Sequence, residues 1–211
     1  MLELLLADGR TPSGSYAHSG GLEAAVTEGL DADGAPAFIR ARLHTVGRTA
    51  AALAAAAAAA ADVAGLLALD GEAAARTPVP AVRAADRSLG TALLRTAAGL
   101  WPADSILAAY REASELTPRA VVLGAVCRAA GLAGVAAARL CLYEDAAGVA
   151  AAAVKLLPLD AARATGWVAG LAVEIDALAA EAPRGLRSTC TPLLDRLAVG
   201  HGARDRRLFA S

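Results

Sequence analysis

The sequence predicts an all-α fold, a single compact helical domain of about eight to ten helices that spans residues 1–211. Alanine, the strongest intrinsic helix former, is the commonest residue. Aromatic residues make up only 3% of the chain, whereas β-strands are rich in aromatics and poor in alanine. Prolines and glycines separate stretches of helical length. Because alanine is small, the core of such a fold must be built from closely approaching helices.

The first predicted helix, Leu2–Ala7, ends where turn-forming residues gather in Asp8–Ser15. The second starts near His18 or Ser19 and runs to Glu28. Loop residues then lead into one long predicted helix over Ala37–Ala61, where no proline or glycine cluster interrupts the alanine-rich sequence.

A further helix is predicted over Val63–Ala75 and ends before Pro78 and Pro80, since proline lacks a backbone donor and restricts the residue before it. Helix resumes over Ala81–Gly99 and is broken again at Pro102. The remaining predicted helices are Ser105–Glu115, Arg119–Ala130, Leu132–Glu144, Gly148–Leu156, Ala161–Ala180 and Pro192–His201.

The charge balance and the apolar stretches indicate whether the protein associates with nucleic acid or with a membrane. The net charge of −1 gives no support for long-range attraction to nucleic acid or to anionic lipid. The apolar stretch Leu4–Ala7 is too short for a signal peptide. Thr49–Leu69 is long enough to span a bilayer, but it consists mostly of alanine, which contributes little insertion energy. We expect a buried helix there in a soluble cytoplasmic protein, with a membrane span as the alternative.

The residue types that carry chemistry form no recognised catalytic pattern. The three cysteines, Cys127, Cys141 and Cys190, contain no CxxC pair, which argues against a disulfide framework and for a reducing compartment. The loop of residues 13–21 is rich in Ser and Gly but contains neither a phosphate-binding loop nor a nucleophile elbow.

The three histidines, at positions 18, 44 and 201, contain no H-x-x-x-H spacing, so no self-contained zinc site is predicted. His18 and His201 could still meet in the fold and bind a metal such as nickel. The residues alone favour a helical binding module, with no catalytic, cofactor or metal residues assigned. The alternative is a helical metal-dependent hydrolase with a site around Ser15, His18 and Glu23.

Motifs at both ends of the chain give a more specific interpretation. Thr11–Glu23 reads TPSGSYAHSGGLE, Ala153–Leu159 reads AVKLLPL, and Arg207–Ser211 reads RLFAS. The chain thereby resembles the UreF family of urease accessory proteins, whose members open with P-x-G-x-[YF]-x-H-S-x-G-L-E and close on R-L-[FY]-x-S. Arg83 and Gly124 also fall where the family pattern has arginine and glycine.

The resemblance implies an all-α, dimeric protein that is not itself an enzyme and carries no cofactor. It implies three partners: the accessory protein UreD, also called UreH; the nickel-carrying GTPase UreG; and apo-urease. In this interpretation the chain bridges UreD and UreG and regulates GTP hydrolysis while nickel is inserted into apo-urease.

The ends of the chain, residues 1–17 and 202–211, are the predicted partner-binding segments. We hypothesise that Tyr16, His18 and the Arg207–Ser211 tail form one contact surface for UreD, since tyrosine and arginine suit interfaces. The full set of predicted partner-binding residues is Tyr16, His18, Glu23, Lys155, His201, Arg207, Leu208 and Phe209.

Two of these residues have alternative interpretations. Lys155 is the only lysine among 20 basic residues, and it matches a family lysine on the side associated with UreG. It could equally be an ordinary surface lysine on a helix. Glu23 is either a carboxylate that faces a partner or a first-turn residue favoured by the helix dipole.

Overall fold

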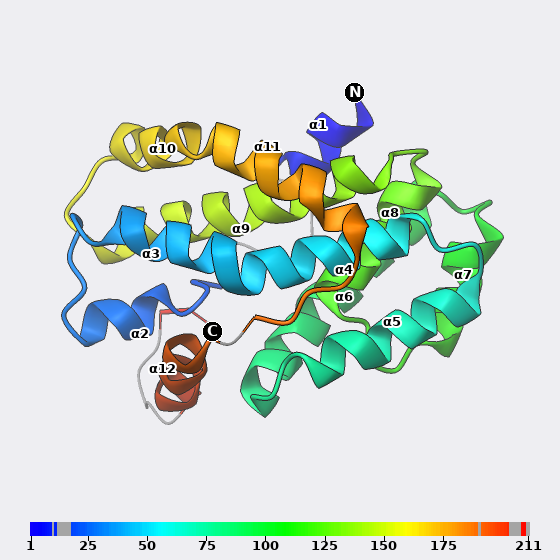
Figure 1. The fold of residues 1–211 in the computed structure, drawn as a ribbon, viewed down its shortest axis with the longest axis horizontal. Helices are drawn as coiled ribbons and strands as arrows, with labels where there is room; N and C mark the ends of the chain where they lie inside the picture. Colours follow the sequence, from blue (N-terminus) through cyan, green and yellow to red (C-terminus); the bar gives the residue numbers. More distant parts are fainter. Residues whose placement is uncertain (10, 12–17, 190, 203–207, 210–211) are drawn as a thin grey trace.

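Helix α9 (Gly134–Leu156) contacts helices from both ends of the chain in the computed structural model, which is drawn in Figure 1. It packs against α1 (Leu2–Ala7), α2 (Leu22–Thr27), α4 (Arg48–Ala58) and α11 (Ala172–Glu181). The structure describes residues 1–9, 11, 18–189, 191–202 and 208–209, with the side chains of 201 and 202 left out, and these residues contain no β-strand.

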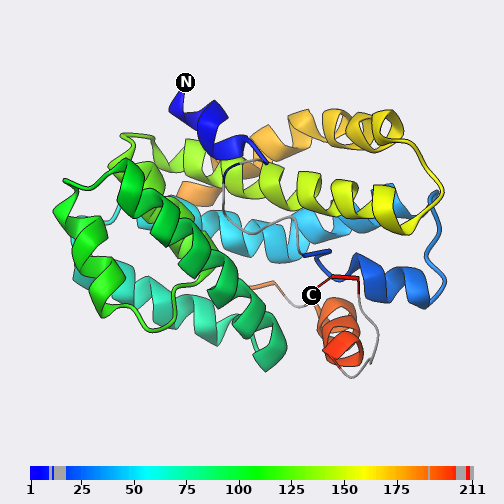
Figure 2. The same cartoon turned by 180° about the vertical axis from the view of Figure 1, so that it is seen from behind.

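The other described helices surround α9 and α4, and Figure 2 shows that α6 and α7 lie on the face turned away from the viewer in Figure 1. The prediction of an all-α fold with a single compact helical domain is confirmed. In chain order these helices are α3 (Ala35–Arg42), the π-helical turn η2 (Leu43–Gly47), α5 (Val63–Ala75), α6 (Pro80–Leu100), α7 (Ser105–Ala113), α8 (Arg119–Ala129), α10 (Ala161–Gly170), the 3-10 turn η3 (Ala182–Arg184) and α12 (Pro192–Gly202).

The elements α3, η2 and α4 form one continuous rod across the molecule (Figure 1). Leu43 and Gly47 keep right-handed helical backbone angles where the three elements join. The predicted long helix over Ala37–Ala61 is therefore present, with a π-helical turn inside it and its end at Ala58. A π turn holds one more residue than an α turn, so the pattern of buried positions is shifted by one residue between α3 and α4.

The stretch Thr49–Leu69 does not form one helix. Helix α4 ends at Ala58 and α5 begins at Val63, after a turn in which the carboxylate of Asp62 accepts a hydrogen bond from the Gly65 amide at 2.8 Å. This is an N-cap, which stabilises a helix start. A membrane span over this stretch was the wrong alternative, and none of the helices in the described part of the chain is long and apolar enough to cross a bilayer.

The second helix is shorter than predicted. We expected it to start near His18 or Ser19, but α2 begins at Leu22. The preceding glycines, Gly20 and Gly21, have φ values of 62° and 87°, in the left-handed region that an α-helix does not use. These two glycines set the start of the helix.

Two other boundaries differ from the prediction in opposite directions. The expected helices Leu132–Glu144 and Gly148–Leu156 merge into α9, because a single glycine such as Gly148 costs a helix only about 1 kcal/mol and does not stop it. The expected helix Ala161–Ala180 is divided into α10 and α11 at Leu171, whose ψ of −1° interrupts the regular helix.

The core confirms the expectation of close helix packing. Gly124 of α8 faces α4 so closely that a β-carbon built on it would lie 2.3 Å from the carbonyl oxygen of Ala54 and 2.5 Å from the β-carbon of Ala57. Alanine, leucine and valine fill most of the two buried clusters, one around α4 to α8 and the other around α2, α3, α9 and α11. The second cluster includes Phe209 from the C-terminal tail.

Candidate functional site

Glu23 connects the start of the chain to its end. It lies in the first turn of α2, and its Oε1 accepts a hydrogen bond from the backbone amide of Leu208 at 2.6 Å. Its Oε2 accepts from the amide of Phe209 at 3.1 Å. Hydrogen bonds to an ionised carboxylate are roughly twice as strong as those between neutral groups. One side chain thus holds two consecutive residues of the tail.

Phe209 and Lys155 complete the attachment of the tail. The ring of Phe209 is 5% exposed and belongs to the buried cluster around α9. The Nζ of Lys155, in the last turn of α9, lies 5.3 Å from the centre of that ring, within the range of a cation–π interaction. The side chain of Leu208, the residue before Phe209, is 64% exposed. The tail therefore buries the side chain of Phe209 and presents that of Leu208 to solvent.

Four of the predicted partner-binding residues meet at this place. They are Glu23, Lys155, Leu208 and Phe209. Tyr16, Arg207 and the side chain of His201 lie outside the described residues, as does Ser15 of the alternative hydrolase site. We call the four contacting residues the tail cluster.

His18 lies near the tail cluster in sequence and is partly buried. Burial lowers the pKa of its imidazole below the usual value, so the neutral form is favoured. The adjacent Ser19 is fully buried, and its Oγ accepts a hydrogen bond from the Glu23 amide at 3.3 Å. This hydroxyl helps to orient the first turn of α2, which carries Glu23.

The loop before α2 is fixed by an arginine that the sequence analysis did not identify. Arg42 donates from Nη1 to the carbonyl oxygen of Gly20 at 2.6 Å. It also donates from Nη2 and Nε to the two carboxylate oxygens of Asp145, at 2.5 Å and 3.2 Å. A β-carbon on Gly20 would lie 3.0 Å from the guanidinium carbon of Arg42, so the glycine of the motif allows this contact. The pair therefore joins the loop to both α3 and α9.

The described side chains contain no group of three or more His, Cys, Asp or Glu that could hold a metal ion. The alternative in which His18 and His201 meet to bind a metal involves the side chain of His201, which lies outside the described residues. His44 contacts Glu174, which also accepts from Arg40 at 3.0 Å. The described cysteines, Cys127 and Cys141, are free thiols, and burial raises the pKa of both, that of Cys127 to about 12.

A buried carboxylate on α5 was missed by the sequence analysis. Asp70 is 2% exposed and accepts hydrogen bonds from the Tyr110 hydroxyl and the Ser114 hydroxyl, both at 2.6 Å. Burial raises its pKa, and the two hydrogen bonds oppose that shift. The only local signal was an acidic residue within an otherwise apolar helix. This network joins α5 to α7 and to the loop that follows.

A second acidic group, partly buried, lies between α6, α8 and α9. Asp86 accepts from the backbone amide of Arg119 at 3.2 Å, and Arg119 donates from Nη2 to Glu144 at 2.7 Å. Burial raises the pKa of Asp86 to about 6 and raises that of Glu144, while the charge of Arg119 opposes both shifts. Arg119 thus serves two partly buried carboxylates, Asp86 through its backbone amide and Glu144 through its guanidinium.

Comparison with known proteins agrees with the motifs at the chain ends. The family model described as UreF matches residues 30–172. The chain is 41% identical over 212 residues to a protein named urease accessory protein UreF from Mycolicibacterium vanbaalenii, with 99% of this chain and 97% of that protein covered. It is 41% identical over 216 residues to the protein of the same name from Mycobacterium bovis and 40% identical over 216 residues to that from Mycobacterium tuberculosis, with the same coverage in both cases.

Proposed function

Because the chain belongs to the UreF family of urease accessory proteins, we propose that it is a non-enzymatic scaffold for urease maturation in the cytoplasm. In this role it bridges UreD, also called UreH, and the GTPase UreG. It regulates GTP hydrolysis by UreG while nickel is inserted into apo-urease. Nickel is the cargo of this process, and the chain needs no cofactor of its own.

The observation that carries the proposal is the tail cluster. The last residue of the N-terminal motif, Glu23, binds two residues of the C-terminal motif, Leu208 and Phe209. The described residues of the two family motifs, at opposite ends of the sequence, therefore contact each other. A scaffold needs such a preformed surface on rigid helices, since pre-organisation lowers the entropy lost on binding.

We assign this surface to UreD. Leu208 is exposed beside the anchored Phe209, so it can contact a partner without releasing the tail. Tyr16, His18, His201 and Arg207 adjoin these residues in sequence and complete the proposed UreD surface. Lys155 lies at the end of α9 and contacts the Phe209 ring, so we place it at the edge where the UreD surface meets the proposed UreG side. A homodimer would present two copies of each surface.

The alternative of a metal-dependent hydrolase around Ser15, His18 and Glu23 is less well supported. A catalytic carboxylate must be available to substrate, metal or water. Both oxygens of Glu23 instead accept hydrogen bonds from the chain's own tail. The scaffold proposal uses this arrangement directly, whereas a hydrolase would have to break it.

Co-expression of the full chain with its cognate UreD and UreG tests the proposal, read by size-exclusion chromatography with light scattering. We expect a co-eluting complex with about two copies of each protein, as the symmetry of a dimeric scaffold requires. A chain that elutes alone beside folded UreD and UreG would refute the proposal.

A truncated variant then tests the assigned surface. Deletion of Leu208–Ser211 together with Arg207→Ala should abolish UreD binding. The matched control is Arg196→Ala. Arg196 is an exposed residue of α12 that pairs with Glu28, and its replacement should leave the complex intact. Retention of UreD by the truncated variant would remove the tail from the proposed surface.

A further inference from the structure

One exposed face of α6 carries a row of arginines. Arg83, Arg87, Thr91 and Arg95 follow one another at intervals of four residues, so each is turned by about 40° from the one before and the four form an inclined row along the helix. All four are exposed. At 1.5 Å per residue the row is about 18 Å long. Together with Arg111 of the neighbouring α7, the three arginines of this row are called the arginine strip.

The arginine strip differs from most other arginines of the molecule in its lack of carboxylate partners. Within the described residues, no hydrogen bond or ion pair involves the guanidinium of Arg87, Arg95 or Arg111. Arg83 donates to the carbonyl oxygens of Thr77 and Pro78, which orient it but leave its charge unneutralised. The arginines that do pair with carboxylates are Arg40, Arg42, Arg48, Arg76, Arg119, Arg128, Arg139, Arg163 and Arg196.

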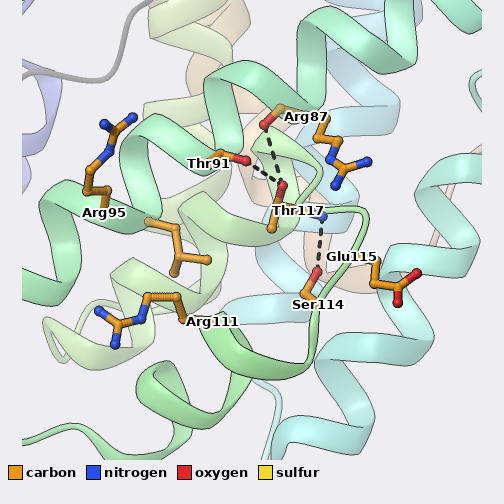
Figure 3. Close-up of a pocket in the computed structure, with 8 residues that line it drawn as sticks. Arg87, Thr91, Arg95, Arg111, Ser114, Glu115 and Thr117 are labelled. Atoms are coloured by element: carbon orange, nitrogen blue, oxygen red, sulfur yellow. Dashed lines mark hydrogen bonds between the residues drawn. The ribbon is translucent and has the colours of Figure 1, made fainter.

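Part of the arginine strip surrounds a hollow of about 320 Å³ between α6 and the end of α7. Figure 3 shows Arg95 and Arg111 toward one end of this hollow and Arg87 toward the other, with Glu115 as the one acidic residue on its lining. Three guanidinium groups against one carboxylate leave a positive potential at the hollow. Such a potential attracts an anionic ligand.

The floor of the hollow is rigid. The Thr91 and Thr117 hydroxyls lie 2.9 Å apart in a hydrogen bond, and Ser114 Oγ accepts from the Thr117 amide at 3.0 Å. Ser114 in turn donates to the buried Asp70. The arginines therefore stand on a fixed frame, so that little backbone order is lost when a ligand binds.

We propose that the arginine strip binds an acidic peptide segment of a partner protein. A single phosphate is too small to contact charges spread over about 18 Å, whereas an extended peptide covers that length in about six residues. The planar fork of arginine also suits carboxylate side chains. Nucleic acid fits less well, because the chain has a net charge of −1 and exposed Glu112 and Glu115 stand beside Arg111. This surface is separate in its residues from the tail cluster and goes beyond the scaffold role proposed above.

Binding of a fluorescein-labelled hexaglutamate peptide to the full-length chain, measured by anisotropy at low salt, tests the proposal. The variant is Arg87→Ser with Arg95→Ser. The matched control is Arg184→Ser with Arg187→Ser, which removes the same charge from two exposed arginines that form no carboxylate pair in the described part of the chain. Circular dichroism melts check that both variants remain folded.

We expect the affinity for hexaglutamate to fall about tenfold in the strip variant and less than twofold in the control, with the wild-type affinity decreasing as salt is added. Arg111→Ser, on a different helix, should weaken binding about threefold, which keeps the proposal testable if the double variant does not fold. Equal losses in the strip variant and the control would overturn it. So would absence of hexaglutamate binding, equal binding of hexaglutamine, or tighter binding of oligothymidylate that is lost in the strip variant.

Discussion

Gly90 of α6 lies so close to Thr117 that a β-carbon built on Gly90 would stand 1.8 Å from the carbonyl oxygen of Thr117. Thr117 itself has a φ of 39°, in the left-handed region that favours glycine. Its amide and hydroxyl are held by Ser114 and Thr91. The contact between α6 and the loop after α7 therefore leaves no room for a side chain at position 90, and hydrogen bonds with Thr91 and Ser114 hold Thr117 in place.

Replacement of Gly90 by alanine should lower the free energy of unfolding by about 3 kcal/mol, because the new methyl group forces α6 away from the loop. Gly99→Ala is the matched control on the same helix, since nothing lies within 4 Å of a β-carbon there. The control should be neutral or stabilising by up to about 1 kcal/mol, as expected for alanine in a helix. Urea denaturation measures both, and equal stability of the two variants would contradict the predicted clash.

The substitution Glu23→Gln should loosen the tail without unfolding the molecule. A glutamine side chain has one acceptor oxygen and no charge, so the two tail amides lose one acceptor and the stronger charge-assisted bonds. Hydrogen exchange at the Leu208 and Phe209 amides should become about tenfold faster. Glu28→Gln, which removes the partner of Arg196, is the control and should leave both amides unchanged. Unchanged exchange in both variants would show that Glu23 does not hold the tail.

The substitution Lys155→Met should have a smaller effect on the same tail. It removes the cation from the Phe209 ring but keeps an apolar chain of similar length, so about 0.5–1 kcal/mol is lost. Exchange at the Phe209 amide should become about threefold faster. Lys155→Arg retains a cation and should stay within about twofold of the wild type. If the methionine and arginine variants behave alike, the contact depends on packing and not on charge.

The dependence of stability on pH should change in Asp86→Asn. The pKa of Asp86 is raised from 3.8 to about 6 in the folded chain, so ionisation of this partly buried carboxyl opposes folding above that pH. This destabilisation is lost as the pH falls, because the Asp86 carboxyl is protonated at a higher pH in the folded state than in the unfolded state. Between pH 7.5 and 4.5 the wild type should gain about 2 kcal/mol relative to Asp86→Asn, whose amide can still accept from the Arg119 amide. Parallel pH profiles in urea denaturation would exclude this role.

The helices were largely predictable because they depend on local properties. Alanine content and the positions of Pro78, Pro80 and Pro102 were enough to locate most helix ends to within a few residues. The predicted start of α2 was wrong because Gly20 and Gly21 adopt left-handed backbone angles, which cannot be read from the sequence. The sequence shows that glycines stand at positions 20 and 21, but their backbone conformation is set by the tertiary fold.

The candidate site was predictable only in part. The family motifs singled out Glu23, Lys155 and Phe209, but nothing in the sequence indicated that Phe209 contacts both Glu23 and Lys155. The pair Arg42 and Asp145 was not predicted at all, since the two residues are separated by 103 positions and each resembles an ordinary charged residue on a helix. Long-range pairing of this kind is set by tertiary packing.

The π-helical turn η2 has a consequence for how related sequences align. Each residue in a helix advances the side chains by about 100°, so a single insertion or deletion normally rotates everything that follows out of the core. A π turn absorbs one extra residue locally, and the faces of α3 and α4 keep their partners on α9. Loss of one residue within Leu43–Gly47 would thus convert the π turn into an α turn and preserve both halves of the rod. A gap of one position between relatives is tolerable here, whereas the same gap inside α4 would expose the buried alanines that face α8.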